Sequence, residues 1–302
     1  MRILVTGAAG YIGSALARFL RARKLDVVAT DQSAPAPVIG NIAYPQFARS
    51  LVTRDVGAVF HLASLVSGGA EQNFELGTKV NLDATRDLLE ACRLAGHRPK
   101  FIFASSIAVY GGVDLVTDDT PPSPGLSYGA QKLICDILID DYTRRGYIDG
   151  RAVRLPTVMV RPGGANTAVS GWTSALVREP LAGRDYVCPV RPDTRIACMS
   201  VRKAVECLFR AFELPAEMLA PNRAILLNGI AVSAQQIRDA AGGAGKVRFE
   251  ADPAVQTIMD AGPKEARSRR AAELGFPSSR SIQEIVDEYK EDHPDPALAR
   301  HG

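Results

Sequence analysis

Near its N-terminus the chain reads Arg2-Ile3-Leu4-Val5-Thr6-Gly7-Ala8-Ala9-Gly10-Tyr11-Ile12-Gly13. The first residues form a β-rich run, as in a parallel central strand that is covered on both faces. Residues 14–20 follow with helical periodicity. Strand, glycine turn and helix thus come in the order of a pyrophosphate site, where glycines let the backbone approach phosphates and a helix N-terminus supplies amides. The spacing is G-x-x-G-x-x-G, and glycine triplets also occur in ordinary turns, but the flanking elements favour the cofactor.

A second predicted strand, residues 26–30, ends at Asp31. A carboxylate in this position can accept hydrogen bonds from both adenosine ribose hydroxyls and repels a 2′-phosphate. No Arg or Lys lies between Gly7 and Gly13, or between Asp31 and Ile42, to bind such a phosphate. A solvated turn carboxylate is the alternative, but the position favours the ribose, so we predict NAD rather than NADP.

The stretch Tyr128-Gly129-Ala130-Gln131-Lys132 places a phenol and an ammonium one helical turn apart, on the same helix face. A nearby cation favours phenolate, so Tyr128 could act as a proton acceptor nearer neutrality than its ordinary pKa of about 10 allows. A hydroxyl from Ser105-Ser106, at a predicted strand end, could hydrogen-bond the same substrate oxygen. By itself, this spacing of Tyr and Lys is also common on ordinary helix surfaces. The catalytic interpretation is favoured here because the same chain carries the glycine loop.

Predicted strands and helices alternate, which indicates an α/β fold with a Rossmann-type, doubly wound parallel sheet. After the first two strands we expect strands over 58–62, 100–105, 151–155 and 223–227, and helices over 71–94, 128–145, 201–212 and 233–240. The segment after Asp31 is short, with only a vestigial strand over 38–42, so we expect a shallow adenine pocket. We assign 1–162 and 196–230 to the NAD-binding core, 163–195 and 231–292 to a smaller interleaved substrate lobe, and 293–302 to a disordered tail. Within the lobe we expect a short helix over 172–177 and a strand over 246–249.

Composition limits the classes of binding partner and the cellular location that we expect. A net charge of +3 is too small to indicate nucleic acid. Five cysteines without a C-x-x-C pair indicate free thiols and a reducing cytoplasm. His61 ends a strand and is expected in the core, and no metal site is predicted. We expect neither a signal peptide nor a membrane span, because no apolar run approaches 18 residues.

The motifs follow the order of the extended short-chain dehydrogenases/reductases, which include nucleotide-sugar epimerases and dehydratases, and the chain resembles this family through most of its length. They are the glycine loop, His61-Leu62-Ala63-Ser64, Asn81-Leu82-Asp83-Ala84-Thr85, Ser105-Ser106, and Tyr128 with Lys132. The middle of the chain is similar to the NAD-dependent D-erythronate dehydrogenases, in residues 149–163, Arg178-Glu179-Pro180-Leu181-Ala182-Gly183 and Cys188-Pro189-Val190. The family usually has an acidic residue at the position of Asn41.

The resemblance implies roles for individual residues. Tyr128 is the expected base, Lys132 would lower its pKa and hold the nicotinamide ribose, and Ser106 would orient the substrate oxygen. Ser106 is preferred to Ser105 because it stands five residues before Gly111, like the family's catalytic hydroxyl. Cofactor contacts are expected from Gly7, Ala9, Gly10, Tyr11, Ile12, Gly13, Asp31, Asn41, Ile42, Leu62, Ala63, Ser64, Asn81, Tyr128, Lys132, Pro156 and Thr157. Asn81 has alternatives: it could hold the backbone or a water chain, or cap a helix.

The first functional hypothesis is NAD-dependent oxidation of a small sugar acid at C2, with D-erythronate giving the 2-oxo acid. The carboxylate could be held by Arg195, which we prefer, or by Arg191 or Arg161. Other expected substrate contacts are Ser67, Ser106, Ile107, Tyr128, Asn166 and Ser170. A nucleotide-sugar epimerase or dehydratase would use the same Ser/Tyr/Lys group and is the alternative. A non-catalytic NAD-binding regulator is disfavoured because all three residues are present.

The family also implies a homodimer. The predicted helix from Tyr128 carries an apolar stripe that is broad for a single sheet contact, formed by Leu133, Ile134, Ile137, Leu138 and Tyr142. Extended members often pair this helix with the one that here holds Leu88 and Leu89. Burial of the stripe against the chain's own sheet is the alternative.

Overall fold

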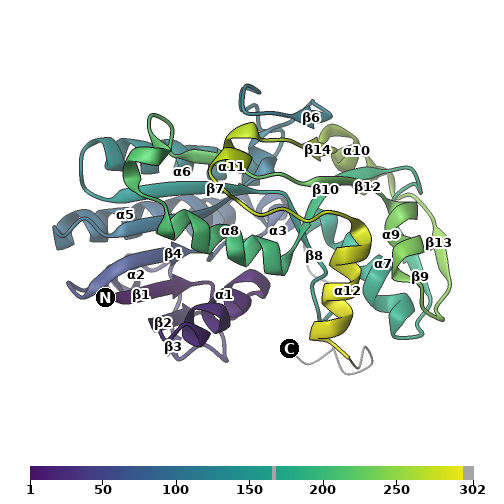
Figure 1. Ribbon diagram of the computed structural model, residues 1–302, viewed down its shortest axis with the longest axis horizontal. Coiled ribbons are helices and arrows are strands. Elements are labelled where there is room, and N and C mark those ends of the chain that lie inside the picture. The colour runs from purple at the N-terminus through teal and green to yellow at the C-terminus, as the bar shows by residue number, and fades with distance from the viewer. Residues whose placement is uncertain (165–167, 295–302) are drawn as a thin grey trace.

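The computed structural model of the protein describes residues 1–164 and 168–294. Its largest element is a parallel sheet of seven strands in the order β11-β7-β5-β4-β1-β2-β3 (Figure 1). The strands are β1 (Arg2–Thr6), β2 (Asp26–Asp31), β3 (Val38–Ile39), β4 (Val56–His61), β5 (Lys100–Ser106), β7 (Asp149–Leu155) and β11 (Ala224–Leu226). From β1 the chain builds one edge through β2 and β3, and then returns to build the other. The predicted Rossmann-type fold class is confirmed.

Helices cover both faces of this sheet (Figure 1). On one face α1 (Tyr11–Ala22) packs against α8 (Val201–Glu213), and their apolar sides share a core with β1, β4 and β5. On the other face lie α2 (Pro45–Ser50), α5 (Ala84–Ala95) and α6 (Ser127–Arg144). Leu16 and Leu20 of α1 are fully buried, which stabilises the fold by roughly 1.5–3 kcal/mol for each side chain. The sheet is therefore covered on both faces, as its apolar strands require.

Three smaller sheets lie beside the large one. They are formed by β8 (Thr157–Met159), β10 (Arg195–Ser200) and β12 (Ile230–Ser233), by β9 (Tyr186–Cys188) with β13 (Val247–Phe249), and by β6 (Leu115–Val116) with β14 (Glu265–Ala266). The accompanying helices are α7 (Trp172–Leu181), α9 (Ala234–Ala241), α10 (Pro253–Ala261), α11 (Arg269–Glu273) and α12 (Ile282–Asp292). Most of these elements come from the segments expected to form the substrate lobe, although β6, β8 and nearly all of β10 come from segments assigned to the core. The division into core and lobe stays a prediction.

The helix expected over 71–94 is interrupted. It consists of α3 (Ser67–Gln72), α4 (Phe74–Gly77), a π-helical segment η1 (Thr78–Asp83) and α5. The Asn73 side chain accepts a hydrogen bond from the backbone N–H of Leu76 (2.9 Å) and so caps a new helix start. The apolar periodicity of the sequence continues across Asn73. It therefore predicted one continuous helix and did not reveal the break.

The disordered tail was expected over 293–302, directly after α12, but His293 is described and contacts that helix. The His293 ring stacks on Tyr289 at 4.6 Å between ring centroids, and its backbone N–H bonds the Tyr289 carbonyl. Residues 295–302 lie outside the described residues.

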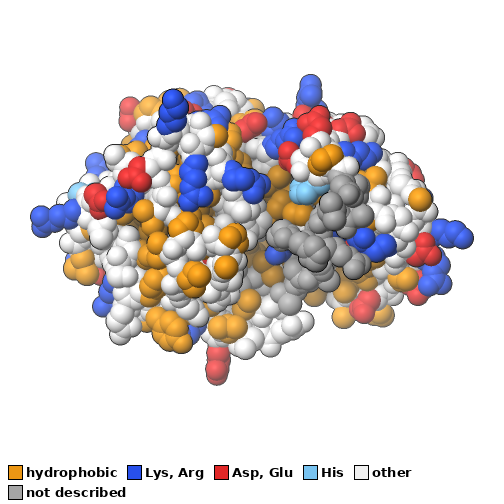
Figure 2. Space-filling model, turned by 90° about the horizontal axis from the view of Figure 1, so that it is seen from below, with side chains coloured by type: hydrophobic (Ala, Val, Ile, Leu, Met, Phe, Trp, Pro, Cys, Tyr) orange, Lys and Arg blue, Asp and Glu red, His pale blue; other side chains and the backbone are white. Residues whose placement is uncertain are grey.

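Figure 2 shows the face that carries β2, β3 and α12, where acidic and basic side chains are interspersed and hydrophobic side chains gather on the half that holds the large sheet. Within the described part of the chain, no helix is both long and apolar enough to cross a bilayer.

His61 lies in the core, in a directed chain of hydrogen bonds. Thr6 Oγ1 accepts from the backbone N–H groups of Leu62 and Ala63 and lies 2.7 Å from His61 Nδ1. On the other side, His61 Nε2 lies 2.9 Å from Thr85 Oγ1, which donates to the Asn81 carbonyl. Thr85 can therefore only accept from the ring, which assigns the neutral imidazole with its proton on Nε2. Burial, with a smaller contribution from Lys132, lowers the pKa of His61 to about 3.

This shift predicts acid destabilisation. Because the unfolded chain binds a proton at His61 near pH 6.5 and the fold does not, stability is complete above pH 6.5 and falls as the pH drops towards 3. We expect about 2 kcal/mol less unfolding free energy from this group at pH 5 than at pH 7.5. His61→Gln should remove that increment, whereas His97→Gln should retain it. Urea unfolding at the two pH values measures the difference, and equal pH dependence in both variants would contradict it.

Candidate active site

A cleft of about 840 Å³ lies at the carboxyl ends of the large sheet's strands. Parallel strands bring the residues that follow them to one edge, which is where open α/β sheets bind their ligands. The cleft is lined by the glycine loop, Asp31, the segment after β4, the end of β5 and the start of α6. The structure thus brings together the motifs that the sequence separates by more than a hundred residues.

Close backbone packing shapes the glycine loop. Gly7 has a φ of 70°, in the left-handed region that favours glycine, and a Cβ at Gly13 would overlap the Gly7 carbonyl. Gly10 is the N-cap of α1 and provides no side chain to bond the first amides of the helix. Those amides and the positive end of the helix dipole are therefore left for a ligand in the cleft, which fits the pyrophosphate of a dinucleotide.

Asp31 ends β2 beside this loop. Its Oδ2 accepts from the backbone N–H of Ala9 (3.0 Å), and its Oδ1 accepts from the backbone N–H and the hydroxyl of Ser33 (both 3.3 Å). The carboxylate is thereby held in the cleft, where an adenosine ribose would meet it. Asn41 and Ile42 also line the cleft, and Asn41 accepts from the backbone N–H of Ala43 at 2.9 Å. The depth of the adenine pocket stays a prediction.

The expected catalytic residues line the same cleft. Ser106 ends β5, and its hydroxyl accepts from the backbone N–H of Ala108 (3.1 Å). A Cβ at Gly129 would overlap the Ala108 carbonyl, so glycine allows the start of α6 to approach this turn. The hydroxyls of Ser64 and Ser106 act on the Tyr128 phenol and lower its pKa. The Lys132 ammonium is buried, donates to the Ala104 carbonyl (2.8 Å) and lies 5.6 Å from the centre of the Tyr128 ring.

Burial dominates the titration of both groups. It raises the pKa of Tyr128 to about 12, against a lowering by the hydrogen bonds with Ser64 and Ser106. It also lowers the pKa of Lys132 to about 8, because removal from water disfavours the charged form. The expectation that Lys132 lowers the pKa of Tyr128 is therefore wrong for the protein without a bound cofactor, where burial keeps that pKa raised. Its ammonium is held by the β5 backbone rather than by the phenol oxygen.

Asn81 does not line the cleft, although it was expected to contact the cofactor. Its side chain is buried and holds the segment after β4 from behind. Oδ1 accepts from the Leu65 N–H (2.7 Å) and the Ser64 hydroxyl (2.9 Å), and Nδ2 donates to the Leu65 carbonyl (3.0 Å) and Gln131 Oε1 (2.7 Å). Of the roles considered for Asn81, holding the backbone is the one the structure shows.

The other expected cofactor contacts, Leu62, Ala63, Ser64, Pro156 and Thr157, line the cleft. So do Ser67, Ile107 and Ser170 on the substrate side, while Asn166 lies outside the described residues. Arg195 is exposed at the start of β10 and lines neither this cleft nor the adjoining cavity, so the preferred carboxylate ligand is not brought to the site. Arg191 is paired with Asp260 (2.9 Å). Arg161, the third candidate, does line the cleft.

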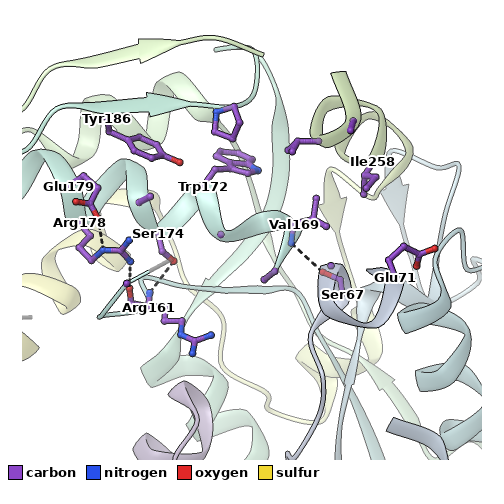
Figure 3. Close-up of a pocket in the computed structure, with 18 of the residues that line it drawn as sticks. Ser67, Glu71, Arg161, Val169, Trp172, Ser174, Arg178, Glu179, Tyr186 and Ile258 are labelled. Atoms are coloured by element: carbon purple, nitrogen blue, oxygen red, sulfur yellow. Dashed lines mark hydrogen bonds and ion pairs between the residues drawn. The ribbon is translucent and has the colours of Figure 1, made fainter. Parts of the chain in front are cut away.

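A second cavity of about 700 Å³ adjoins the cleft and shares Ser67, Arg161 and Ser174 with it. Figure 3 shows its aromatic side, formed by Trp172 and Tyr186, with Ile258 opposite. Motif analysis missed the contributions of α7 and α10 to both spaces. A helix was expected over 172–177, but neither α7 nor α10 carries a binding motif, and only the tertiary fold brings them to the strand ends.

Sequence analysis also missed a buried polar chain beside the site. Arg154 of β7 donates from Nε to Asp136 Oδ2 (2.9 Å) and from Nη1 to the Tyr110 hydroxyl (2.7 Å). Asp136 stands one helical turn after Lys132, and Tyr110 lines the cleft. The four-residue spacing from Lys132 was the available signal. Among residues 1–164 and 168–294, no cluster of His, Cys, Asp and Glu is arranged to hold a metal ion.

Comparison with known proteins agrees with this geometry. The chain is 43% identical to a D-erythronate dehydrogenase of Cupriavidus necator, over 97% of this chain and 98% of that one. It is 35% identical to a D-erythronate dehydrogenase of Haemophilus influenzae, over 96% and 99%. A solved structure, described as the nucleoside-diphosphate-sugar epimerase from Agrobacterium tumefaciens, superposes with a TM-score of 0.90 at 34% identity and covers 99% of this chain and 96% of that one.

A family model supplies the remaining comparison. Residues 3–224 match the model of the NAD dependent epimerase/dehydratase family. This span holds the glycine loop, Asp31, Ser106, Tyr128 and Lys132. The matched residues are thus the ones that the fold gathers at the cleft, and NAD is the cofactor that the cleft fits. The chain therefore belongs to the NAD dependent epimerase/dehydratase family.

Proposed function

We propose that the protein oxidises a small free sugar acid at C2 with NAD as the acceptor, and that D-erythronate is its substrate, giving 2-oxo-D-erythronate. The observation that carries the proposal is the position of Ser106, Tyr128 and Lys132 in one cleft with the glycine loop. Two relatives that align over nearly the whole chain bear the name D-erythronate dehydrogenase, which supports the choice of acid.

In this reaction Tyr128 accepts the proton of the C2 hydroxyl, and Ser106 orients that oxygen. NAD, when bound, accepts the hydride and brings a positively charged ring to the site. A positive charge favours the phenolate form of Tyr128, which burial alone disfavours. Lys132 keeps its place through the Ala104 carbonyl and offers its other N–H donors to the cleft. Ser67 and Ser170 are neutral donors for the acid group.

Interconversion of nucleotide-linked sugars is the second candidate. The same Ser/Tyr/Lys group serves both chemistries, and the solved relative at 34% identity is described as a nucleoside-diphosphate-sugar epimerase. The cavity beside the cleft offers about 700 Å³ to a larger ligand. The two candidates differ in their yield of NADH, because an epimerisation returns the hydride to the sugar.

A substrate panel separates the two. Purified protein with NAD should produce NADH from D-erythronate and much less from its lactone, the matching polyol or UDP-sugars. Tyr128→Phe should keep NAD affinity but lose turnover by at least about a hundredfold, because the proton acceptor is gone. Arg195→Lys is the control and should match the unmodified protein, since Arg195 does not reach the cleft.

Two outcomes would contradict the proposal. Conversion of nucleotide sugars without net NADH, together with no activity on any C4–C6 aldonate, would replace it by the epimerase. Near-normal turnover in folded Tyr128→Phe would remove Tyr128 as the base while leaving the substrate assignment intact.

We also propose that Asp31 sets the preference for NAD. The double variant Asp31→Ser/Gln32→Arg should shift the ratio of kcat/KM for NADP over NAD upward by at least about tenfold, because a repulsive charge is lost and a phosphate partner is gained. NAD use itself should also weaken, since the Ala9 N–H loses its acceptor. An unchanged ratio would leave Asp31 as an anchor of the loop only.

A homodimer is proposed from the outer face of α6. Ile137 is 61% exposed and Ile134 is 43% exposed, which is a high exposure for apolar side chains on one helix. Leu88 and Leu89, expected at the same interface, are fully buried in the chain's own core, so the expectation was wrong for them.

The five free cysteines are all buried, which is consistent with a proposed cytoplasmic location.

Light scattering at micromolar concentration tests the dimer. The unmodified protein should have twice the mass of one chain, and Ile137→Glu should be monomeric, because a carboxylate would be buried without a partner. Leu115→Glu, at an exposed apolar position on β6, is the matched control and should stay dimeric. A monomer for the unmodified protein would end the proposal.

A further inference from the structure

Three charged side chains line the large cleft within the described residues: Asp31, Lys132 and Arg161. Asp31 is bonded to the glycine loop, and Lys132 donates to the Ala104 carbonyl. The guanidinium of Arg161 makes no hydrogen bond or ion pair with any residue that the structure describes. Among the described residues, it is the charged group of this cleft without a protein partner.

The backbone of Arg161 is fixed on α7. Its N–H donates to the hydroxyl of Ser174 (3.0 Å), and its carbonyl accepts from Arg178 Nη1 (3.0 Å). Arg178 is buried and is itself held by Glu179 Oε1 at 2.8 Å. In Figure 3 the Arg161 guanidinium extends away from Ser174 and Arg178. The side chain thus projects from a rigid support, although its charged group has no partner among the residues that the structure describes.

The side chain opens onto the same cleft as the start of α1. Arg161 and Tyr11 line the same cleft, and Tyr11 is the first residue of that helix. The charge of Arg161 acts on the Tyr11 phenol, where it lowers a pKa that burial and Asp292 raise. Arg161 and the amides that Gly10 leaves uncapped therefore share one cleft.

The charges at the glycine-loop end of the cleft leave room for a favourable cation. A diphosphate brings two negative charges, and the end of a helix offsets only about half of one elementary charge. Asp31, on the same side, adds a further negative charge. The glycine loop itself contains no Arg or Lys between Gly7 and Gly13. A cation from another part of the chain would offset the remaining charge, and Arg161 lines the same cleft.

We infer that Arg161 binds the diphosphate of NAD from α7, opposite the glycine loop. A planar guanidinium suits this ligand because it can donate two parallel hydrogen bonds to phosphate oxygens. The inference rests on the NAD site described above and is independent of the proposed sugar acid. It gives Arg161 a role in cofactor binding in place of the carboxylate-binding role considered for it from the sequence.

Direct binding of NAD, ADP-ribose and adenosine to the protein tests this inference by calorimetry, without substrate. Arg161→Met should weaken NAD and ADP-ribose by about tenfold to a hundredfold, the usual effect of losing hydrogen bonds to a charged group, and leave adenosine unchanged. Arg161→Lys keeps the positive charge but loses the planar guanidinium, so it should bind NAD and ADP-ribose with intermediate affinity. Arg195→Met, an exposed guanidinium outside the cleft, is the matched control and should bind all three like the unmodified protein.

Both variants keep the backbone contacts of residue 161 with α7, so they test the side chain alone. Unchanged affinity of Arg161→Met for NAD and ADP-ribose would overturn the inference. So would an equal loss for adenosine, which lacks a diphosphate, or a raised KM for the sugar acid with unchanged NAD affinity. Because the measurement requires no turnover, a failure of the proposed oxidation would leave its result interpretable.

Discussion

The architecture of the site depends on one close backbone contact, between Gly13 in the first turn of α1 and the carbonyl of Gly7 at the end of β1. Only the absence of a Cβ permits this distance. The contact draws α1 against the strand end, so its free amides open into the cleft and its apolar side covers the sheet. A matching contact, Gly129 against the Ala108 carbonyl, draws α6 against the end of β5. Two helices are thus set by glycine at the same edge, and the reactive groups lie between them.

The local motifs could be read from sequence because their chemistry is local. The glycine loop, Asp31 and the Tyr128–Lys132 pair each depend on residues within one strand-turn-helix unit, and the parallel sheet brings these units to one edge. The substrate side could not be read in this way. Arg161 and Arg195 look equivalent as residues near predicted strands, and only the tertiary packing puts one in the cleft and the other on the surface. The pKa of Tyr128 was misjudged for a related reason, because the Tyr128–Lys132 spacing does not show how strongly burial raises the pKa of the phenol.

The Arg154–Asp136 pair illustrates how the site is held. An ion pair inside a protein contributes little net stability, because desolvation offsets the attraction, but its geometry is specific. Here it joins β7 to α6 one turn beyond Lys132, and its second bond reaches Tyr110 at the cleft. The rotation of α6 about its axis is therefore fixed where Lys132 must meet the Ala104 carbonyl. This polar chain in the core contributes alignment rather than stability.

The hydrogen-bond chain through His61 has a direction, running from the Ala63 N–H through Thr6, the imidazole and Thr85 to the Asn81 carbonyl. Each hydroxyl accepts on one side and donates on the other, so no member can reverse alone. The strand that begins the nucleotide loop, the strand beside it and the π-helical segment therefore form one cooperative unit. Replacement of any single member by an apolar residue leaves hydrogen-bonding groups of both its neighbours without a partner in the core.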